Sequence, residues 1–284
     1  MKKFLLPSKK SSYPVQKHLL NTLAFILIVV LTLGYSLSNG VDSIKTQAAS
    51  KKLIKKKVLF VGNSFTYKND LPNMFKKLAL SGGYNITIGS STYGGYTLLQ
   101  HSDADDEKGK ITLSKITSKK WDYVVLQEQS QFPAYDNLRE EMYEGARKLD
   151  KVIKDNESTP IFFMTWGYKN GDTYNSVDAT KTFEGMQEQI QIGYETIADE
   201  LSDQISPVGI AWLNAYQTYP NINLWAADNK HPSIAGTYLT ACVMYETLLG
   251  KSPVGLEFTY KLSIEKAKAL QEIAHNTCAA YIAE

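Results

Sequence analysis

A serine, a histidine and an aspartate in this chain have the residue types and surroundings of a catalytic triad. Asp228 stands three residues before His231 in "DNKHPS", and Ser64 follows Gly62 and Asn63 much earlier, in "VGNSFT". A serine hydroxyl becomes a strong nucleophile when a base removes its proton, and histidine titrates close to neutral pH. A carboxylate on the second ring nitrogen fixes the tautomer and stabilises the imidazolium. The three residues therefore predict acyl transfer, with Ser64 as nucleophile, His231 as base and Asp228 as its partner.

Pro232 follows the histidine directly and constrains its backbone. A proline disfavours the α conformation in the residue before it, and it is favoured at the first position of a helix. We therefore expect a helix that starts at Pro232, with His231 extended at its entrance. Two ordinary interpretations compete with this one: an Asp-His surface loop, and a serine that only caps a helix.

Apolar runs alternate with amphipathic stretches from Val58 to the C-terminus, which is the pattern of strands alternating with helices. The expected strands lie in residues 56–64, 84–92, 121–129, 159–167 and 204–213. The expected helices lie near residues 71–82, 110–120, 137–156, 178–202, 232–250 and 263–283. Such alternation predicts one doubly wound α/β domain with a parallel sheet covered on both faces. Its ligand crevice would lie at the carboxyl ends of the strands, where Ser64 stands.

Candidate oxyanion donors follow the second and third strands. Gly94 and Gly95 in "STYGGYTLLQH" allow a turn that brings a backbone N–H close to the crevice, although they also fit a simple turn. Gln127 and Gln129 fall on one side of the third strand by alternation, and either amide could donate. Together with the N–H of Ser64, these groups predict an oxyanion hole.

The motifs together resemble those of the SGNH/GDSL hydrolase superfamily. "GNSFT", the Gly94–Gly95 block, the amides after the third strand and "DNKHPS" occur in the family's order over residues 57–250. The resemblance implies a flavodoxin-like three-layer α/β/α sandwich with a mainly parallel five-stranded sheet. It also implies the triad above, and an oxyanion hole made by the N–H groups of Ser64 and Gly95 and an amide from the third block. That block reads "LQEQSQ" without the family's asparagine, so Gln129 or Gln127 would take its place.

The expected function is hydrolysis of an acyl ester, above all an acetyl ester on an extracellular carbohydrate. Tyr96, Trp166 and Trp225 lie near strand ends or the histidine loop, where aromatic rings suit stacking on sugars. The mechanism requires no metal or cofactor, and the small-molecule or glycan ester is the only partner expected. The alternatives are a lipid esterase or thioesterase on the same triad, and a non-catalytic glycan-binding domain at the cell surface.

The first part of the chain has the order of an export signal. Lysines precede an apolar run from Leu19 to Leu37, so residues 1–37 are expected to be a signal peptide or an N-terminal membrane anchor. A polar, lysine-rich linker over residues 38–56 would join it to a hydrolase-like domain over residues 57–284. The domain would then be extracellular, either secreted or held on the outer face of the membrane by the N-terminal segment.

Charge and cysteine usage narrow the possible partners. Residues 1–57 hold eleven lysines and one acid, which leaves 20 basic and 28 acidic residues from Val58 onward. An acidic body argues against nucleic acid as a partner. The four histidines are scattered, and neither Cys242 nor Cys278 belongs to a metal-binding pattern. Cys242 lies in an apolar helical pattern, which predicts a small buried thiol.

Overall fold

The computed structural model describes residues 52–172 and 177–283, and the expected signal peptide or anchor lies outside them. Five parallel strands form one sheet in the order β2-β1-β3-β4-β5. They are β1 (Ile54–Gly62), β2 (Tyr84–Thr92), β3 (Tyr123–Leu126), β4 (Thr159–Phe163) and β5 (Gln204–Ser206). This architecture confirms the predicted doubly wound, flavodoxin-like α/β fold. β1 begins inside the stretch expected to be the linker.

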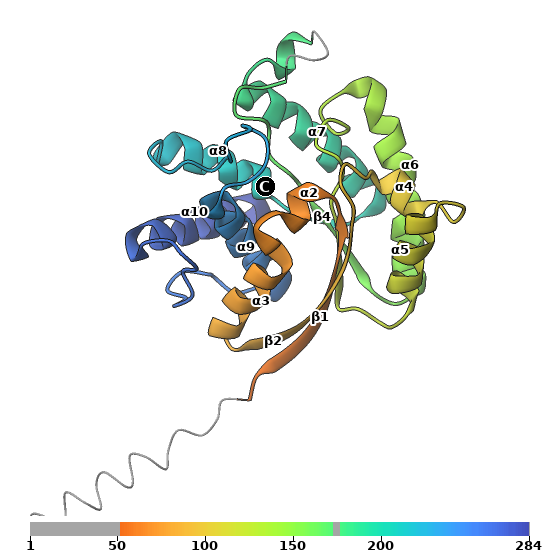
Figure 1. Cartoon of the computed structure of the whole chain (residues 1–284), viewed down its shortest axis with the longest axis horizontal. Helices are drawn as coiled ribbons and strands as arrows, with labels where there is room; N and C mark the ends of the chain where they lie inside the picture. The colour runs from red at the N-terminus through yellow and green to blue at the C-terminus, as the bar shows by residue number, and fades with distance from the viewer. Residues whose placement is uncertain (1–51, 173–176, 284) are drawn as a thin grey trace, which may run out of the picture. The chain divides into compact units, whose positions relative to one another are not determined.

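Helices cover both faces of the sheet (Figure 1). On one side lie α3 (Leu71–Ser81), α8 (Val208–Thr218) and α9 (Ile234–Leu249), with α10 (Ile264–Ala283) packed against α8 and α9. The opposite side holds α4 (Leu98–Ser102), α5 (Glu107–Thr117), α6 (Asp136–Asp155) and α7 (Phe183–Leu201). Short helices are α2 (Ser64–Tyr67), η1 (Lys68–Asp70) and η2 (Asp178–Thr180). The core strand residues of β1 and β3 are accordingly buried, as in sheets covered on both faces.

The prediction of one strand over residues 204–213 is wrong. β5 ends at Ser206, and α8 begins at Val208, with Pro207 at the cap position. Val208, Ala211 and Trp212 are buried at helical spacing. A short apolar run cannot distinguish a buried strand from a buried helix by periodicity alone. Pro207, which has no backbone N–H to donate to a ladder, marks the boundary.

The predicted helix start at Pro232 is also wrong. α9 begins at Ile234, and the hydroxyl of Ser233 caps it by accepting a hydrogen bond from the N–H of Gly236. Serine is a preferred cap, so it fixes the start two residues after the proline. Pro232 instead pairs with Trp225 in an isolated antiparallel bridge. His231 is outside the helix, as the sequence predicted.

The connections of the sheet place a crevice at the carboxyl end of β1. From β1 the chain passes to β2 on one side, and then returns across to β3 on the other. The two loops that leave β1 and β3 therefore diverge at this point, which is where doubly wound folds bind ligands. Among the described residues, no helix has both the length and the apolar character needed to cross a bilayer.

Candidate active site

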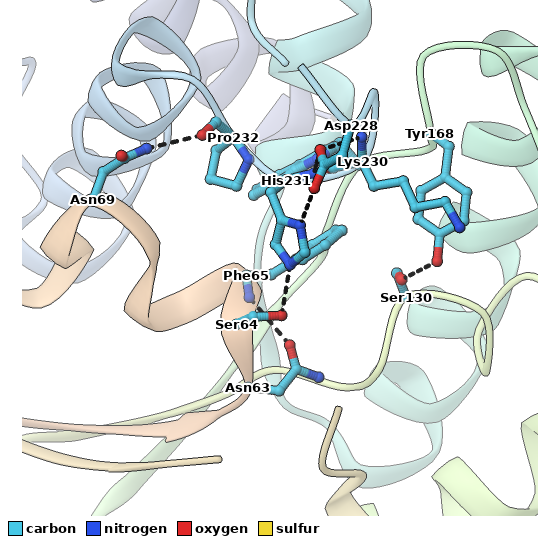
Figure 2. Close-up of polar contacts among 11 residues, drawn as sticks. Asn63, Ser64, Phe65, Asn69, Ser130, Tyr168, Asp228, Lys230, His231 and Pro232 are labelled. Carbon is cyan, nitrogen blue, oxygen red and sulfur yellow. Dashed lines mark hydrogen bonds and ion pairs between the residues drawn. The ribbon is translucent and has the colours of Figure 1, made fainter. Parts of the chain in front are cut away.

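Ser64, His231 and Asp228 form one continuous hydrogen-bonded chain (Figure 2). The Nε2 atom of His231 lies 2.8 Å from the Oγ atom of Ser64, and its Nδ1 atom lies 2.5 Å from Oδ2 of Asp228. Ser64 begins α2 directly after β1, whereas the other two residues lie in the loop between α8 and α9. The structure thus brings together the three residues that the sequence predicted as a triad.

The histidine loop is shaped by the same aspartate. Oδ1 of Asp228 accepts hydrogen bonds from the backbone N–H groups of Lys230, at 3.0 Å, and His231, at 2.9 Å. Asn229 takes a left-handed conformation with φ of 58°, which asparagine tolerates better than most residues. One carboxylate oxygen therefore folds the loop, while the other receives the imidazole.

The charge of Asp228 determines which nitrogen of the His231 ring carries the proton. Partial burial raises the pKa of this carboxyl, but hydrogen bonds from the His231 ring and from the N–H groups of Lys230 and His231 outweigh it. The net effect lowers the pKa from 3.8 to about 2. An ionised carboxylate requires a proton on Nδ1 of His231, so in the neutral imidazole Nε2 is the acceptor for the Ser64 hydroxyl.

Asn63, and not Ser64, caps the short helix α2. Its Oδ1 atom accepts a hydrogen bond from the N–H of Phe65 at 3.1 Å, and its Nδ2 atom donates to the carbonyl of Tyr96 at 3.0 Å. The interpretation of Ser64 as the helix cap is therefore wrong. The Ser64 hydroxyl faces the histidine, and Asn63 joins the Ser64 segment to the loop after β2.

A second asparagine joins the Ser64 segment to the histidine loop. The Nδ2 atom of Asn69 donates to the carbonyl of Pro232 at 2.8 Å (Figure 2). It also donates to the hydroxyl of Thr237 at 2.9 Å. Asn69 lies five residues after Ser64 and has a positive φ of 51°. This link could not be predicted from the sequence, because it depends on two segments that meet only in the fold.

Gln127, one of the two predicted oxyanion amides, is not among the residues that line the small cavity beside Ser64. It is fully buried, and its Oε1 atom accepts from the N–H of Asn63 and the hydroxyl of Thr66, each at 2.8 Å. Its Nε2 atom donates to Oδ1 of Asn63 at 3.0 Å. A Cβ at Gly62 would lie only 2.5 Å from Oε1 of Gln127, so this contact explains the glycine of "GNS". The assignment of Gln127 to the oxyanion hole is corrected: it supports the nucleophile's segment.

We expect Gln127→Ala to lower the free energy of unfolding by about 3 kcal/mol, because it leaves two buried donors without an acceptor. Urea unfolding followed by circular dichroism measures this loss. Gln129→Ala is the matched control, since Gln129 is only partly buried and should change stability by less than about 1 kcal/mol. Equal losses in the two variants would contradict the different placements of the two glutamines.

The other predicted oxyanion residues line a small cavity beside the triad. Its volume is about 110 Å³, and its walls are Asn63, Ser64, Phe65, Gly95, Gln129, Ser130, Tyr168, Lys230 and His231. Gly95 has a φ of 69°, which favours glycine. Among the described residues, neither the N–H of Ser64 nor that of Gly95 donates to another residue. Nε2 of Gln129 has only a long contact, 3.3 Å, to Oε1 of Gln131. These three donors are therefore available to a ligand.

Ser130, Tyr168 and Lys230 form the wall opposite the serine. Tyr168 lies near a predicted strand end, where aromatic rings were expected, but Ser130 and Lys230 were not predicted from the sequence. The hydroxyls of Ser130 and Tyr168 lie 2.8 Å apart, and Nζ of Lys230 lies 4.5 Å from the centre of the Tyr168 ring (Figure 2). Lys230 is adjacent to His231 in the chain, which is the one signal that could have identified it. The result is a polar wall with one cation at its rim.

Trp166 and Trp225 do not offer their rings to a substrate, so that prediction is wrong. Both are buried; Trp166 stacks between Phe65 and Trp212 with ring centres 4.7 Å and 3.9 Å apart. The indole N–H of Trp166 donates to the carbonyl of Lys230, so Trp166 supports the loop that carries His231. Trp225 donates in the same way to the carbonyl of Gly167. Buried tryptophans commonly find such partners for their N–H groups.

Tyr96 is half-buried outside the set of residues that line the cavity. Its hydroxyl donates to Asp106 at 2.6 Å; burial and this hydrogen bond raise the pKa of Tyr96 to about 12. The ring packs beside His101, whose imidazole is buried and bonded to the carbonyl of Gly62. Tyr96 thus braces the loop after β2, and its predicted contact with substrate has no support in this placement.

The described cysteines are free and buried. Cys242 and Cys278 form no disulfide, and the burial of Cys242 confirms its predicted core position. Among residues 52–172 and 177–283, no group of three or more His, Cys, Asp or Glu side chains could hold a metal ion.

Comparison with known proteins identifies the fold. The sequence matches no protein-family model and no curated protein. A protein from Slackia heliotrinireducens, described as a candidate SGNH hydrolase, shares 25% identity with a TM-score of 0.58, over 68% of this chain and 99% of that one. A DUF4886 family protein from Bacteroides uniformis reaches a TM-score of 0.69 at 21% identity, over 79% of this chain and 95% of that one. A candidate GDSL-like lipase from Parabacteroides merdae has a TM-score of 0.54 at 15% identity, over 70% of this chain and 98% of that one. The chain therefore has the fold of the SGNH/GDSL hydrolase superfamily, as its motifs predicted.

Proposed function

We propose that the protein is a serine esterase in which Ser64, His231 and Asp228 act as the catalytic triad. The observation that carries this proposal is the unbroken chain from Oγ of Ser64 through the imidazole to the Asp228 carboxylate. The likeness to SGNH/GDSL hydrolases supports the same reaction class.

The geometry suits attack by the serine on an ester carbonyl. As Oγ of Ser64 bonds to the carbonyl carbon, its proton passes to Nε2 of His231. The oxyanion would accept hydrogen bonds from the N–H groups of Ser64 and Gly95 and from the amide of Gln129, each worth about 3 kcal/mol. His231 then protonates the departing alcohol, which leaves an acyl-serine. Water attacks this ester and gives its proton to His231, and collapse of the second intermediate releases the acid and returns the proton to Ser64.

The size of the cavity favours a short acyl group. A volume of about 110 Å³ is well below the roughly 300–1,000 Å³ typical of pockets for drug-sized ligands, so the space beside Ser64 suits a small group. Phe65 and Tyr168 provide apolar wall, and Gln129, Ser130 and Lys230 provide polar groups that disfavour burial of a long alkyl chain. We therefore propose acetyl esters as substrates and place the lipid esterase or thioesterase second.

An extracellular carbohydrate remains the proposed carrier of the acetyl group. This part rests on the export signal expected in residues 1–37, since the two buried tryptophans no longer contribute to it. Location outside the cytoplasm, secreted or held at the outer face of the membrane, is proposed on the same ground.

A fluorophosphonate probe and a series of p-nitrophenyl esters test the proposal. We expect the probe to modify Ser64, identified by peptide mass mapping, and kcat/KM to fall by at least tenfold from acetate to octanoate. Ser118→Ala, a change at the exposed end of α5, is the control that should leave both results unchanged. Faster hydrolysis of octanoate would favour the lipid esterase. An unreactive protein that still binds polysaccharide would favour the non-catalytic glycan-binding alternative.

A further inference from the structure

A fully buried carboxyl lies behind the loops that carry the oxyanion donors. Glu128 comes two residues after the end of β3 and is 0% exposed. Its oxygens accept hydrogen bonds from two backbone groups, Oε2 from the N–H of Leu98 at 3.1 Å and Oε1 from the N–H of Gln129 at 2.5 Å. Burial is the main cause that raises the pKa of Glu128, to about 8, while the hydrogen bonds from the N–H groups of Gln129 and Leu98 oppose this rise.

The two N–H groups belong to different loops of the candidate oxyanion hole. Leu98 starts α4, three residues after Gly95, and Thr97 caps this helix with both bonds of a capping box. Gln129 lines the cavity beside Ser64. A single side chain therefore ties the loop that follows β2 to the loop that follows β3.

We propose that Glu128 is a positioning residue for ester hydrolysis: its carboxyl fixes the spacing between the Gly95 loop and the Gln129 loop, and so aligns the oxyanion donors. This inference rests on the proposed esterase function. Glu128 does not line the cavity, so it acts through the two loops and not on the substrate.

A carboxyl is costly at this position. The preceding strand residues Val124, Val125 and Leu126 are apolar and buried, so Glu128 is a polar group in an apolar environment. An apolar side chain would avoid this cost, but it would leave the N–H groups of Leu98 and Gln129 without an acceptor. The nearby ionisable groups do not offset the cost of burying the carboxyl. Glu141 repels a charged Glu128 carboxylate. The hydroxyl of Tyr194 accepts a hydrogen bond from the backbone N–H of Glu128, not from its side chain. What the carboxyl adds is a pair of acceptors that reach both loops at once.

Kinetics of Glu128→Ala and Glu128→Gln on p-nitrophenyl acetate test the proposal. We expect Glu128→Ala to lower kcat at least tenfold with KM within about twofold, because misplaced oxyanion donors weaken only the transition state. Glu128→Gln keeps one oxygen for one N–H group and presents an NH₂ group to the other. Its kcat should therefore lie between those of the wild type and Glu128→Ala. Asp150→Asn is the matched control, since Asp150 is a buried carboxyl on α6, paired with Lys154. It should lose stability with kcat unchanged.

Rates are expressed per folded molecule, with the folded fraction measured by circular dichroism. If Glu128→Gln unfolds at lower urea concentration but keeps the wild-type kcat, Glu128 is only structural and the proposal is overturned; this variant decides the matter if Glu128→Ala does not fold. A wild-type protein that neither hydrolyses esters nor reacts with fluorophosphonate would instead overturn the esterase function.

Discussion

Replacement of Ser64 by alanine is expected to lower kcat/KM for p-nitrophenyl acetate by at least about 10⁴-fold. The variant lacks the hydroxyl oxygen that is hydrogen-bonded to Nε2 of His231, so acyl-serine cannot form. Whatever turnover remains would come from water attack assisted by the oxyanion donors. Stability should change by less than about 1 kcal/mol, because Ser64 is half-buried and Asn63 provides the helix cap.

Steady-state hydrolysis and urea unfolding of purified Ser64→Ala measure the two effects. Ser130→Ala is the matched control: Ser130 lines the same cavity but its hydroxyl bonds to Tyr168 and not to the histidine. We expect it to lose less than tenfold. If Ser64→Ala keeps turnover close to wild type, then Ser64 is not the nucleophile.

Asp228→Asn is expected to lower kcat by about 10⁴-fold, with a smaller effect on KM. An asparagine at this position can present its NH₂ group to Nδ1, which favours the tautomer with the proton on Nε2. That tautomer cannot accept the proton of Ser64. The loop should persist, because the amide oxygen can still accept from the N–H groups of Lys230 and His231.

The ionisation of Asp228 also makes the stability of the folded protein depend on pH. The pKa of Asp228 is lowered in the folded protein, from 3.8 to about 2, so its ionised form stabilises the fold. That contribution is fully present above pH 4, and it is lost as the pH falls from about 4 toward 2. Urea unfolding of the wild type and Asp228→Asn should therefore converge in stability over this acid range. A constant difference between them down to pH 2 would contradict the lowered pKa. Asp155→Asn, a change of an exposed carboxylate at the end of α6 that pairs with Lys151, serves as the kinetic control and should change kcat less than threefold.

The residues of the proposed triad could be predicted from the sequence because each of them carries a local signal. Asp228, His231 and Pro232 are near neighbours in the chain, and Ser64 directly follows a strongly apolar strand. The doubly wound fold followed from alternation alone. By contrast, residues 204–213 were predicted as one strand, which is wrong. The three residues of β5 and the start of α8 form a single apolar run, and the run alone does not show the boundary.

The third block shows why the supporting residues could not be predicted. Strand alternation placed Gln127 and Gln129 on one face and Glu128 on the other. However, β3 ends at Leu126, so alternation no longer applies after it. Gln127 and Glu128 are both buried, and only Gln129 reaches the cavity. The rings of Trp166 and Trp225 present the same difficulty, because position along the chain does not show which way a side chain faces.

The link from Asn69 to Pro232 has a consequence for how this fold can diversify. The proposed nucleophile, base and carboxylate, and the Asn69 amide that joins their segments, all come from residues 63–70 and 228–232. The loops after β2, β3 and β4 support these two segments through the Tyr96 carbonyl, Gln127 and Trp166. Loop residues that make none of these contacts can change, and so change which esters fit, while the spacing of Ser64 and His231 stays the same.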